Sequence, residues 1–294
     1  LRTPVIAASG AFGYGKEYHG YYDINCLGSF SFKGTTLNPR LGNPLPRIAE
    51  TASGLLNAVG LQNPGVEHVL AHELPELQAF FHKKVIANIS GFSVEEYQRA
   101  CEMIDASDAV GLIEVNISCP NVHGGGMSFG ASAESAALVT KAVKAVTKKP
   151  VYMKLSPNVT DVTEFAASAK DCGADAVSAV NTFLGMKIDV ATGRPHFINR
   201  VAGLSGPAIR PIAVRIVYEI FAKVDLPVIG IGGIGSLDDV LEFLMAGASA
   251  VSIGTMSLIN PGTGIECVQG LEAYMREHNI ESPGAIIGAA HRIP

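Results

Sequence analysis

One stretch of the sequence joins an apolar run to a glycine-rich loop: Glu114-Val115-Asn116-Ile117-Ser118-Cys119-Pro120-Asn121-Val122-His123-Gly124-Gly125-Gly126. It predicts a strand that presents two amides, Asn116 and Asn121, and the thiol of Cys119 at its carboxyl end. The three glycines that follow predict a flexible loop, and a strand end of this kind is typical of a site over which a loop closes. The alternative is that Cys119 is a compact core residue, as free cysteines often are.

Similar apolar runs recur along the whole chain. Several consist of continuous Val, Ile and Ala, which is typical of parallel strands buried on both faces. The runs span residues 4–10, 27–34, 85–91, 111–119, 151–157, 176–183, 227–235 and 250–256.

Helical periodicity fills the intervals between these runs. It covers residues 65–81, 94–104, 132–147, 162–172, 208–224, 237–246 and 264–278, and capping residues stand near several starts, at Ser93, Ser132, Asp161 and Ser236. Strands that alternate with helices in this way predict an α/β fold, a single (β/α)8 TIM barrel. An open doubly wound sheet is the alternative. Its dinucleotide-binding form carries G-x-G-x-x-G after the first strand, and this sequence does not.

Two connections are longer than the others. Residues 35–62 predict a short hairpin of 47–51 with 55–61, and residues 183–203 place a turn sequence, 189–193, between two extended runs. Both follow the carboxyl ends of strands, the face on which TIM barrels build their sites. We therefore expect extra hairpins on that face, close to a site.

Composition narrows the functional classes. The 294 residues are 48% hydrophobic and 17% charged, as in a soluble globular protein, and we expect one domain over residues 1–294. A net charge of −5 without a Lys/Arg run argues against nucleic acid, and no apolar run reaches the roughly 18 residues of a membrane span. Five cysteines without a C-x-x-C motif argue against a metal site or a disulfide framework and favour the cytoplasm. Because an apolar strand begins almost at Leu1, we expect a few residues to precede it.

Polar residues gather at the predicted strand ends. They are Ser9, Lys33, Gly34, Asn88, Asn116, Cys119, Lys154, Asn181 and Thr182, with Asn57 and Asn121 in adjoining loops. Each alone also fits a cap, a turn or a lysine that reaches solvent, but their convergence from six strands predicts a site without a carboxylate. The lysines favour an anion, and the amides favour a ring edged with N–H and C=O groups, such as a pyrimidine. Cys119 is the candidate for proton transfer, and redox chemistry would require a cofactor.

Glycine-rich segments follow the last two strands and open the sixth helix. Their residues include Gly206, Gly232, Gly233, Gly254 and Thr255. Backbone N–H groups exposed at helix starts bind phosphate, and TIM barrels commonly bind phosphate at this place. The alternative is a set of tight turns that bind nothing.

Five segments together resemble one family, dihydroorotate dehydrogenase. They are residues 4–10, 32–36, 57–65, 116–121 and 230–235, in order over essentially the whole chain. With Cys at position 119, this segment resembles the cytosolic class 1 enzymes, whereas class 2 enzymes carry Ser at the same place. The run 121–126, followed by Phe129-Gly130, is similar to class 1B, the NAD-linked type.

The resemblance implies FMN across the carboxyl-end face of the barrel. It implies flavin-ring contacts from Ser9, Lys33, Gly34, Asn88, Asn116, Lys154 and Val180, and phosphate contacts from Gly206, Gly232, Gly233, Gly254 and Thr255. It implies that dihydroorotate is held by Lys33, Asn57, Ala58, Val59, Gly60, Leu61, Asn116, Asn121, Asn181 and Thr182. Cys119 would remove a proton from one ring carbon while hydride leaves its neighbour for the flavin, which gives orotate.

The resemblance also implies partners. Class 1B catalytic subunits form a homodimer within a heterotetramer and pass electrons to a subunit that carries FAD and a [2Fe–2S] cluster. This sequence lacks a four-cysteine pattern for such a cluster. Three alternatives remain open: a fumarate-linked class 1A enzyme, a dihydropyrimidine dehydrogenase, and a non-redox phosphate-binding barrel.

Overall fold

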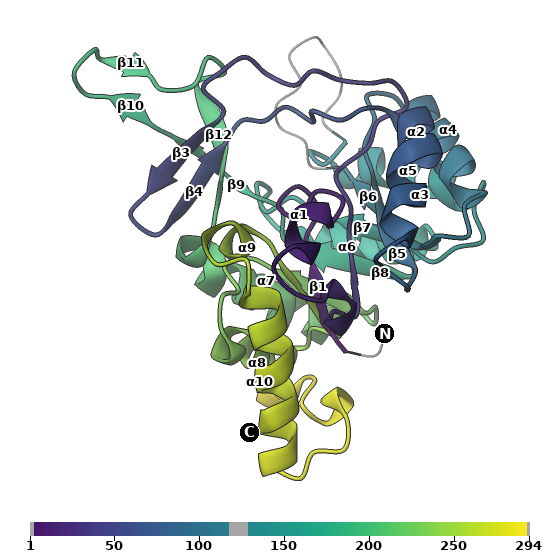
Figure 1. Cartoon of the computed structure of the whole chain (residues 1–294), viewed down its shortest axis with the longest axis vertical. Helices are drawn as coiled ribbons and strands as arrows, with labels where there is room; N and C mark the ends of the chain where they lie inside the picture. The colour runs from purple at the N-terminus through teal and green to yellow at the C-terminus, as the bar shows by residue number, and fades with distance from the viewer. Residues whose placement is uncertain (1–2, 118–128, 293–294) are drawn as a thin grey trace.

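Eight parallel strands form a barrel in this computed structural model, which describes residues 3–117 and 129–292 (Figure 1). In spatial order they are β2 (Ser29–Phe30), β1 (Val5–Ala7), β14 (Ala250–Ile253), β13 (Val228–Ile231), β8 (Ala176–Ala179), β7 (Val151–Lys154), β6 (Val110–Asn116) and β5 (Val85–Ile89). Parallel bridges between Ser31 and Ile86 and between Thr35 and Ile89 join the two ends of this order. The (β/α)8 barrel predicted from the sequence is therefore confirmed.

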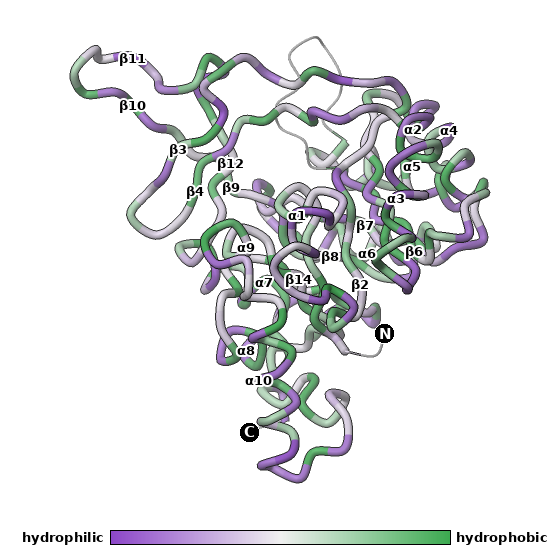
Figure 2. The backbone as a smooth tube through the Cα atoms, in the orientation of Figure 1, coloured by the Kyte–Doolittle hydropathy of each residue, from purple (hydrophilic) through white to green (hydrophobic). Residues whose placement is uncertain are grey.

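Helices surround the barrel, and along them hydrophilic and hydrophobic residues are mixed (Figure 2). Capping by Ser93, Ser132, Asp161 and Ser236 is confirmed, because each side chain accepts from a backbone N–H in the first helical turn. The helices are α2 (Val66–His68), a π-helical segment (Val69–Glu73), α3 (Leu74–Gln78), α4 (Val94–Asp105), α5 (Ala133–Lys144), α6 (Val162–Asp171), α7 (Arg210–Lys223), α8 (Leu237–Ala246) and α10 (Thr263–Glu277), with short α1 (Lys16–His19) and α9 (Thr255–Ile259).

The barrel interior is layered. Ile6, Ile86, Tyr152 and Ile229 belong to a buried apolar cluster contributed by β1, β5, β7 and β13. Successive side chains of a strand point to opposite faces, so the interior residues of each strand recur at every second position. A second and larger cluster of apolar residues packs the helices against the strands.

The two long connections pair with each other, which the sequence did not indicate. β3 (Ile48–Thr51) and β4 (Gly54–Asn57) form the predicted hairpin, and β12 (Val201–Ser205) adds to β4 and to β9 (Phe183–Met186). The result is one four-stranded antiparallel sheet beside the barrel, from which the hairpin of β10 (Ile188–Asp189) and β11 (Arg194–Pro195) extends (Figure 1).

All eight predicted runs extend past the observed ends of their strands, and in three of them a specific contact or element explains the difference. β2 ends before the run 27–34 does, because the Lys33 N–H donates to Gly13 O at 2.9 Å and not to the neighbouring strand. The run 176–183 divides because β8 ends at Ala179 and Phe183 starts β9 in the other sheet. The run 250–256 ends earlier because α9 begins at Thr255. Within the described residues, we find no helix with both the length and the apolar character needed to cross a membrane.

Candidate active site

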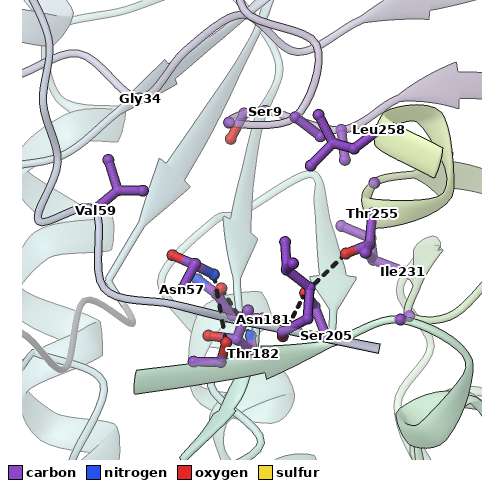
Figure 3. Close-up of a pocket in the computed structure, with 18 of the residues that line it drawn as sticks. Ser9, Gly34, Asn57, Val59, Asn181, Thr182, Ser205, Ile231, Thr255 and Leu258 are labelled. Carbon is purple, nitrogen blue, oxygen red and sulfur yellow. Dashed lines mark hydrogen bonds between the residues drawn. The ribbon is translucent and has the colours of Figure 1, made fainter. Parts of the chain in front are cut away.

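A pocket opens at the carboxyl ends of the barrel strands, and residues of the four-stranded sheet form part of its wall (Figure 3). It gathers nearly all of the predicted site residues: Ser9, Lys33, Gly34, Asn57, Val59, Gly60, Leu61, Asn88, Asn116, Lys154, Val180, Asn181, Thr182, Gly206, Gly232, Gly233, Gly254 and Thr255. Ala58 is the exception, since its side chain is buried behind this wall. Cys119 and Asn121 lie outside the described residues. Their roles in binding and catalysis stay predictions.

The floor of the pocket rests on a buried polar network. Glu114, only 2% exposed, accepts hydrogen bonds from Ser31 Oγ at 2.7 Å and Ser178 Oγ at 3.2 Å, and also from Asn88 Nδ2. Its Oε1 lies 3.7 Å from Nζ of Lys154. Lys154 and Asn88 both line the pocket, so this carboxylate supports two residues that a ligand would touch.

Glu114 does not itself line the pocket, but it supports two residues that do, and it was not among the predicted site residues. The signal was present in the sequence, because Glu114 and Asn116 are two positions apart on one strand and therefore share a face. A charged residue inside an apolar strand of a buried barrel needs a buried partner, and Lys154 of the next strand supplies it. The same placement raises the pKa of Tyr152 well above its ordinary value, through burial and then through the nearby charge of Glu114.

Two amides join the ends of β6 and β8 above this floor. Asn181 Nδ2 donates to Asn116 Oδ1 at 3.1 Å, and Asn181 Oδ1 accepts from the backbone N–H of Thr182 at 2.8 Å. The Tyr97 hydroxyl donates to the carbonyl of Asn116 at 2.8 Å. Figure 3 shows Asn181 and Thr182 next to Asn57, so the amides reach the pocket from one side.

The segment 57–61 forms another wall, and loop contacts hold it in place. Asn43 Nδ2 donates to the carbonyl of Ala58 at 2.9 Å, and Arg47 Nη1 donates to Gln62 Oε1 at 2.5 Å. Gly60 has a φ of +75°, and a Cβ there would come within 2.5 Å of the Asn43 side chain. The close approach of the two loops therefore requires a glycine at position 60.

Glycines form the far end of the pocket. Gly206, Gly232 and Gly233 have φ values of +100°, +140° and +74°, a region that favours glycine. A Cβ on Gly233 would lie 2.7 Å from the carbonyl oxygen of Gly206, so these loops pack backbone against backbone. Thr255 Oγ1 donates to Ser205 Oγ at 2.7 Å beside them (Figure 3). Such a wall presents backbone N–H groups, the donors that phosphate oxygens prefer.

The other four cysteines are free thiols. Burial raises the pKa of Cys101 and of Cys267 to about 12, and burial raises that of Cys26 to about 11. None of the four lines the pocket. A thiol base at this site would therefore have to be Cys119.

Comparison with known proteins gives consistent matches over nearly the full chain. The family model for dihydroorotate dehydrogenase matches residues 1–275. The catalytic subunit of dihydroorotate dehydrogenase B (NAD(+)) from Desulforamulus reducens is 50% identical over 292 residues, covering 98% of this chain and 95% of that protein. The proteins of the same name from Listeria innocua and Bacillus pumilus are 51% identical over 282 residues and 48% identical over 288 residues. These two alignments cover 96% and 98% of this chain, and 92% and 93% of the relatives.

Proposed function

Because this chain belongs to the dihydroorotate dehydrogenase family, we propose that it oxidises dihydroorotate to orotate in pyrimidine biosynthesis, with FMN as its cofactor. The observation that carries the proposal is the pocket itself. It brings two lysines, four amides and a glycine wall together in one cavity, and these residues come from segments spread along the whole chain.

The donors and acceptors of the pocket suit a flavin with a phosphate tail. Asn88 Oδ1 is fully buried and has no hydrogen-bond partner among the described residues, so it offers an acceptor for a ring N–H. A Cβ on Gly34 would lie only 2.8 Å from that oxygen, so the glycine keeps the space beside it open. We infer that the ring lies against Asn88 and Lys154 and that the phosphate lies on Gly206, Gly232, Gly233, Gly254 and Thr255.

The reaction removes a proton and a hydride from adjacent ring carbons of dihydroorotate. Bound FMN supplies the acceptor for the hydride. The substrate carboxylate and ring amides would be bound by Lys33, Asn116 and Asn181, with the segment 57–61 as the opposing wall. The proton would go to the Cys119 thiolate, which requires neighbours that favour the ionised form, because a free thiol has a pKa of about 8.5 and is only slightly ionised at neutral pH.

The electrons would pass to NAD⁺ through a second subunit. The relatives are named catalytic subunits of an NAD(+) enzyme, which supports a separate partner, and we propose that this partner carries FAD and a [2Fe–2S] cluster. Large apolar side chains are exposed on the small sheet and its hairpin, at Leu184, Met186, Ile188 and Val190. These exposed residues support protein contacts on this side of the molecule, and we propose a homodimer within a heterotetramer.

Stopped-flow flavin reduction tests the proposal. The purified protein should be yellow with releasable FMN, and dihydroorotate should bleach it. In Cys119→Ala, FMN should stay bound while substrate-driven bleaching is lost, and Cys119→Ser should retain some activity at higher pH, because a hydroxyl is the weaker acid. Near-normal bleaching of Cys119→Ala would remove Cys119 as the base, and a colourless wild-type protein would refute the function itself.

Substrate and acceptor assays separate the alternatives. A dihydropyrimidine dehydrogenase would be bleached by 5,6-dihydrouracil, whereas the proposed enzyme should respond to dihydroorotate. Fumarate should fail to reoxidise the reduced protein quickly, and NAD⁺ should do so when the partner subunit is added. Rapid reoxidation by fumarate alone would assign the chain to class 1A.

A further inference from the structure

Glu114 is a buried charge in the interior of a barrel whose lower layer is apolar. It lies between the apolar cluster of Ile6, Ile86 and Tyr152 and the floor of the pocket. Burial of a carboxylate costs several kcal/mol unless partners compensate it, and an apolar residue could fill the same space without that cost. The position therefore calls for a role that an apolar side chain could not perform.

One contact of Glu114 determines the orientation of an amide. An ionised carboxylate only accepts hydrogen bonds, so the Asn88 atom that faces Glu114 must be the donor, Nδ2. Asn88 Oδ1 is then turned away from Glu114, toward Gly34. The unpartnered oxygen of Asn88 is thus held as an acceptor at the pocket wall, and a ligand that meets it must present an N–H.

A second contact determines the position of a cation. Lys154 is 6% exposed, and its ammonium group lies 3.7 Å from Glu114 Oε1. Ser178 donates to this same oxygen and Ser31 to the other, so both carboxylate oxygens are held. The carboxylate thereby keeps a positive charge in a nearly dry wall of the pocket, where an uncompensated ammonium would be unfavourable.

We propose that Glu114 is a positioning residue that sets the electrostatics of the flavin site through Lys154 and Asn88. It holds one cation and one acceptor against the bound ring, and the cation favours the more negative, reduced flavin. Tyr152 is a further titratable group beside Glu114, and it stays neutral because burial and the charge of Glu114 raise its pKa. The inference rests on the proposed function, since it assigns the ring to this end of the pocket.

The test is the Glu114→Gln variant of the holoenzyme, with FMN affinity and flavin midpoint potential as readouts. Gln keeps the shape but removes the counter-charge, and its own amide lets Asn88 turn. We expect FMN to bind at least about tenfold more weakly and the midpoint potential to fall. The double variant Glu114→Gln/Lys154→Met should have the same lowered potential as Glu114→Gln, because the single variant no longer holds the Lys154 ammonium against the ring and the double variant removes that ammonium.

A matched control distinguishes this role from a purely structural one. Asp239→Asn also neutralises a buried, ion-paired carboxylate, and it should lower stability while leaving the midpoint potential unchanged. A wild-type potential in Glu114→Gln, a raised potential, or additive effects in the double variant would overturn the inference. If Glu114→Gln does not fold, the double variant leaves neither charge unpaired and should fold, and a wild-type potential there would refute the proposal. A colourless wild-type protein would instead refute the proposed function.

Discussion

Asn181, which follows β8, donates a hydrogen bond from its Nδ2 to Oδ1 of Asn116 at the end of β6, and the two atoms are 3.1 Å apart. The bond spans β7, the strand between them, and both residues line the pocket. Each amide therefore constrains which atoms the other can offer to a substrate.

Asn181→Ala should weaken substrate binding more than cofactor binding. It removes an amide that we propose faces the substrate, together with the hydrogen bond that Asn181 donates to Asn116 Oδ1, so we expect the KM for dihydroorotate to rise about tenfold or more. Flavin content of the purified protein should be unchanged. Asn25→Ala is the control, because Asn25 bonds to Asp23 and Phe80 at the amino ends of the strands, and its kinetics should match the wild type. An unchanged KM in Asn181→Ala would contradict this assignment.

Gly60→Ala should displace the segment 57–61. The substitution combines an unfavourable φ of +75° with a Cβ only 2.5 Å from Asn43. We expect kcat/KM for dihydroorotate to fall about tenfold while FMN remains bound. Steady-state kinetics and flavin fluorescence measure the two effects.

A second glycine provides the control for Gly60. Gly193 has a φ of +69° in the turn of the outer hairpin, with nothing within 4 Å of the position of a Cβ. Gly193→Ala carries the same backbone penalty without the clash, so its kinetics should be those of the wild type. Equal losses in the two variants would mean that backbone strain alone, and not the contact with Asn43, governs the effect.

Asp239→Asn should destabilise the fold. One carboxylate oxygen accepts from the backbone N–H groups of Gly235 and Ser236 at 2.8 and 3.0 Å, and the other pairs with Arg210. Loss of this buried charge should cost about 2–4 kcal/mol in the free energy of unfolding, measured by urea denaturation. Glu242→Gln removes an exposed carboxylate 3.2 Å from Nε of the same arginine and should cost less than about 1 kcal/mol. Similar losses in both variants would contradict the reason given.

Stability should fall in alkali because of the buried thiols. The folded-state pKa of Cys101 and of Cys267 is raised to about 12, so the native state holds protons that the unfolded state releases from about pH 8.5. Their stabilisation is complete below that pH and is lost as the pH rises toward 12. Each group should contribute a slope of up to about 1.4 kcal/mol per pH unit in the free energy of unfolding.

Urea denaturation from pH 8 to pH 11 measures this slope. Cys101→Ala should flatten it, because the variant has one thiol fewer to titrate. Val139→Ala, which shortens a fully buried side chain on α5 by two carbons, should lower stability by the same amount at every pH. A slope in Cys101→Ala equal to that of the wild type would exclude this thiol as its source.

Local sequence patterns were sufficient to predict the barrel strands, the main helices and most of the residues that line the pocket. Capping at Ser93 and Ser236 and the continuous apolar strands reflect preferences that act over a few residues. Since parallel strands place their carboxyl ends on one face, the order of elements already brought Lys33, Asn88 and Lys154 together. The side chain of Ala58 does not line the pocket, because a motif specifies a segment while burial specifies which of its side chains face inward, and its role in binding stays a prediction.

The sequence by itself determined the barrel, the face that carries the site, and the family, because strand periodicity, element order and motif order are properties of the linear chain. Only the tertiary structure decided that the two long connections form one sheet over the pocket, and that Glu114 joins Asn88 and Lys154 beneath it. Those contacts join residues that are far apart in the chain and become neighbours only when the strands pair, so they depend on long-range packing.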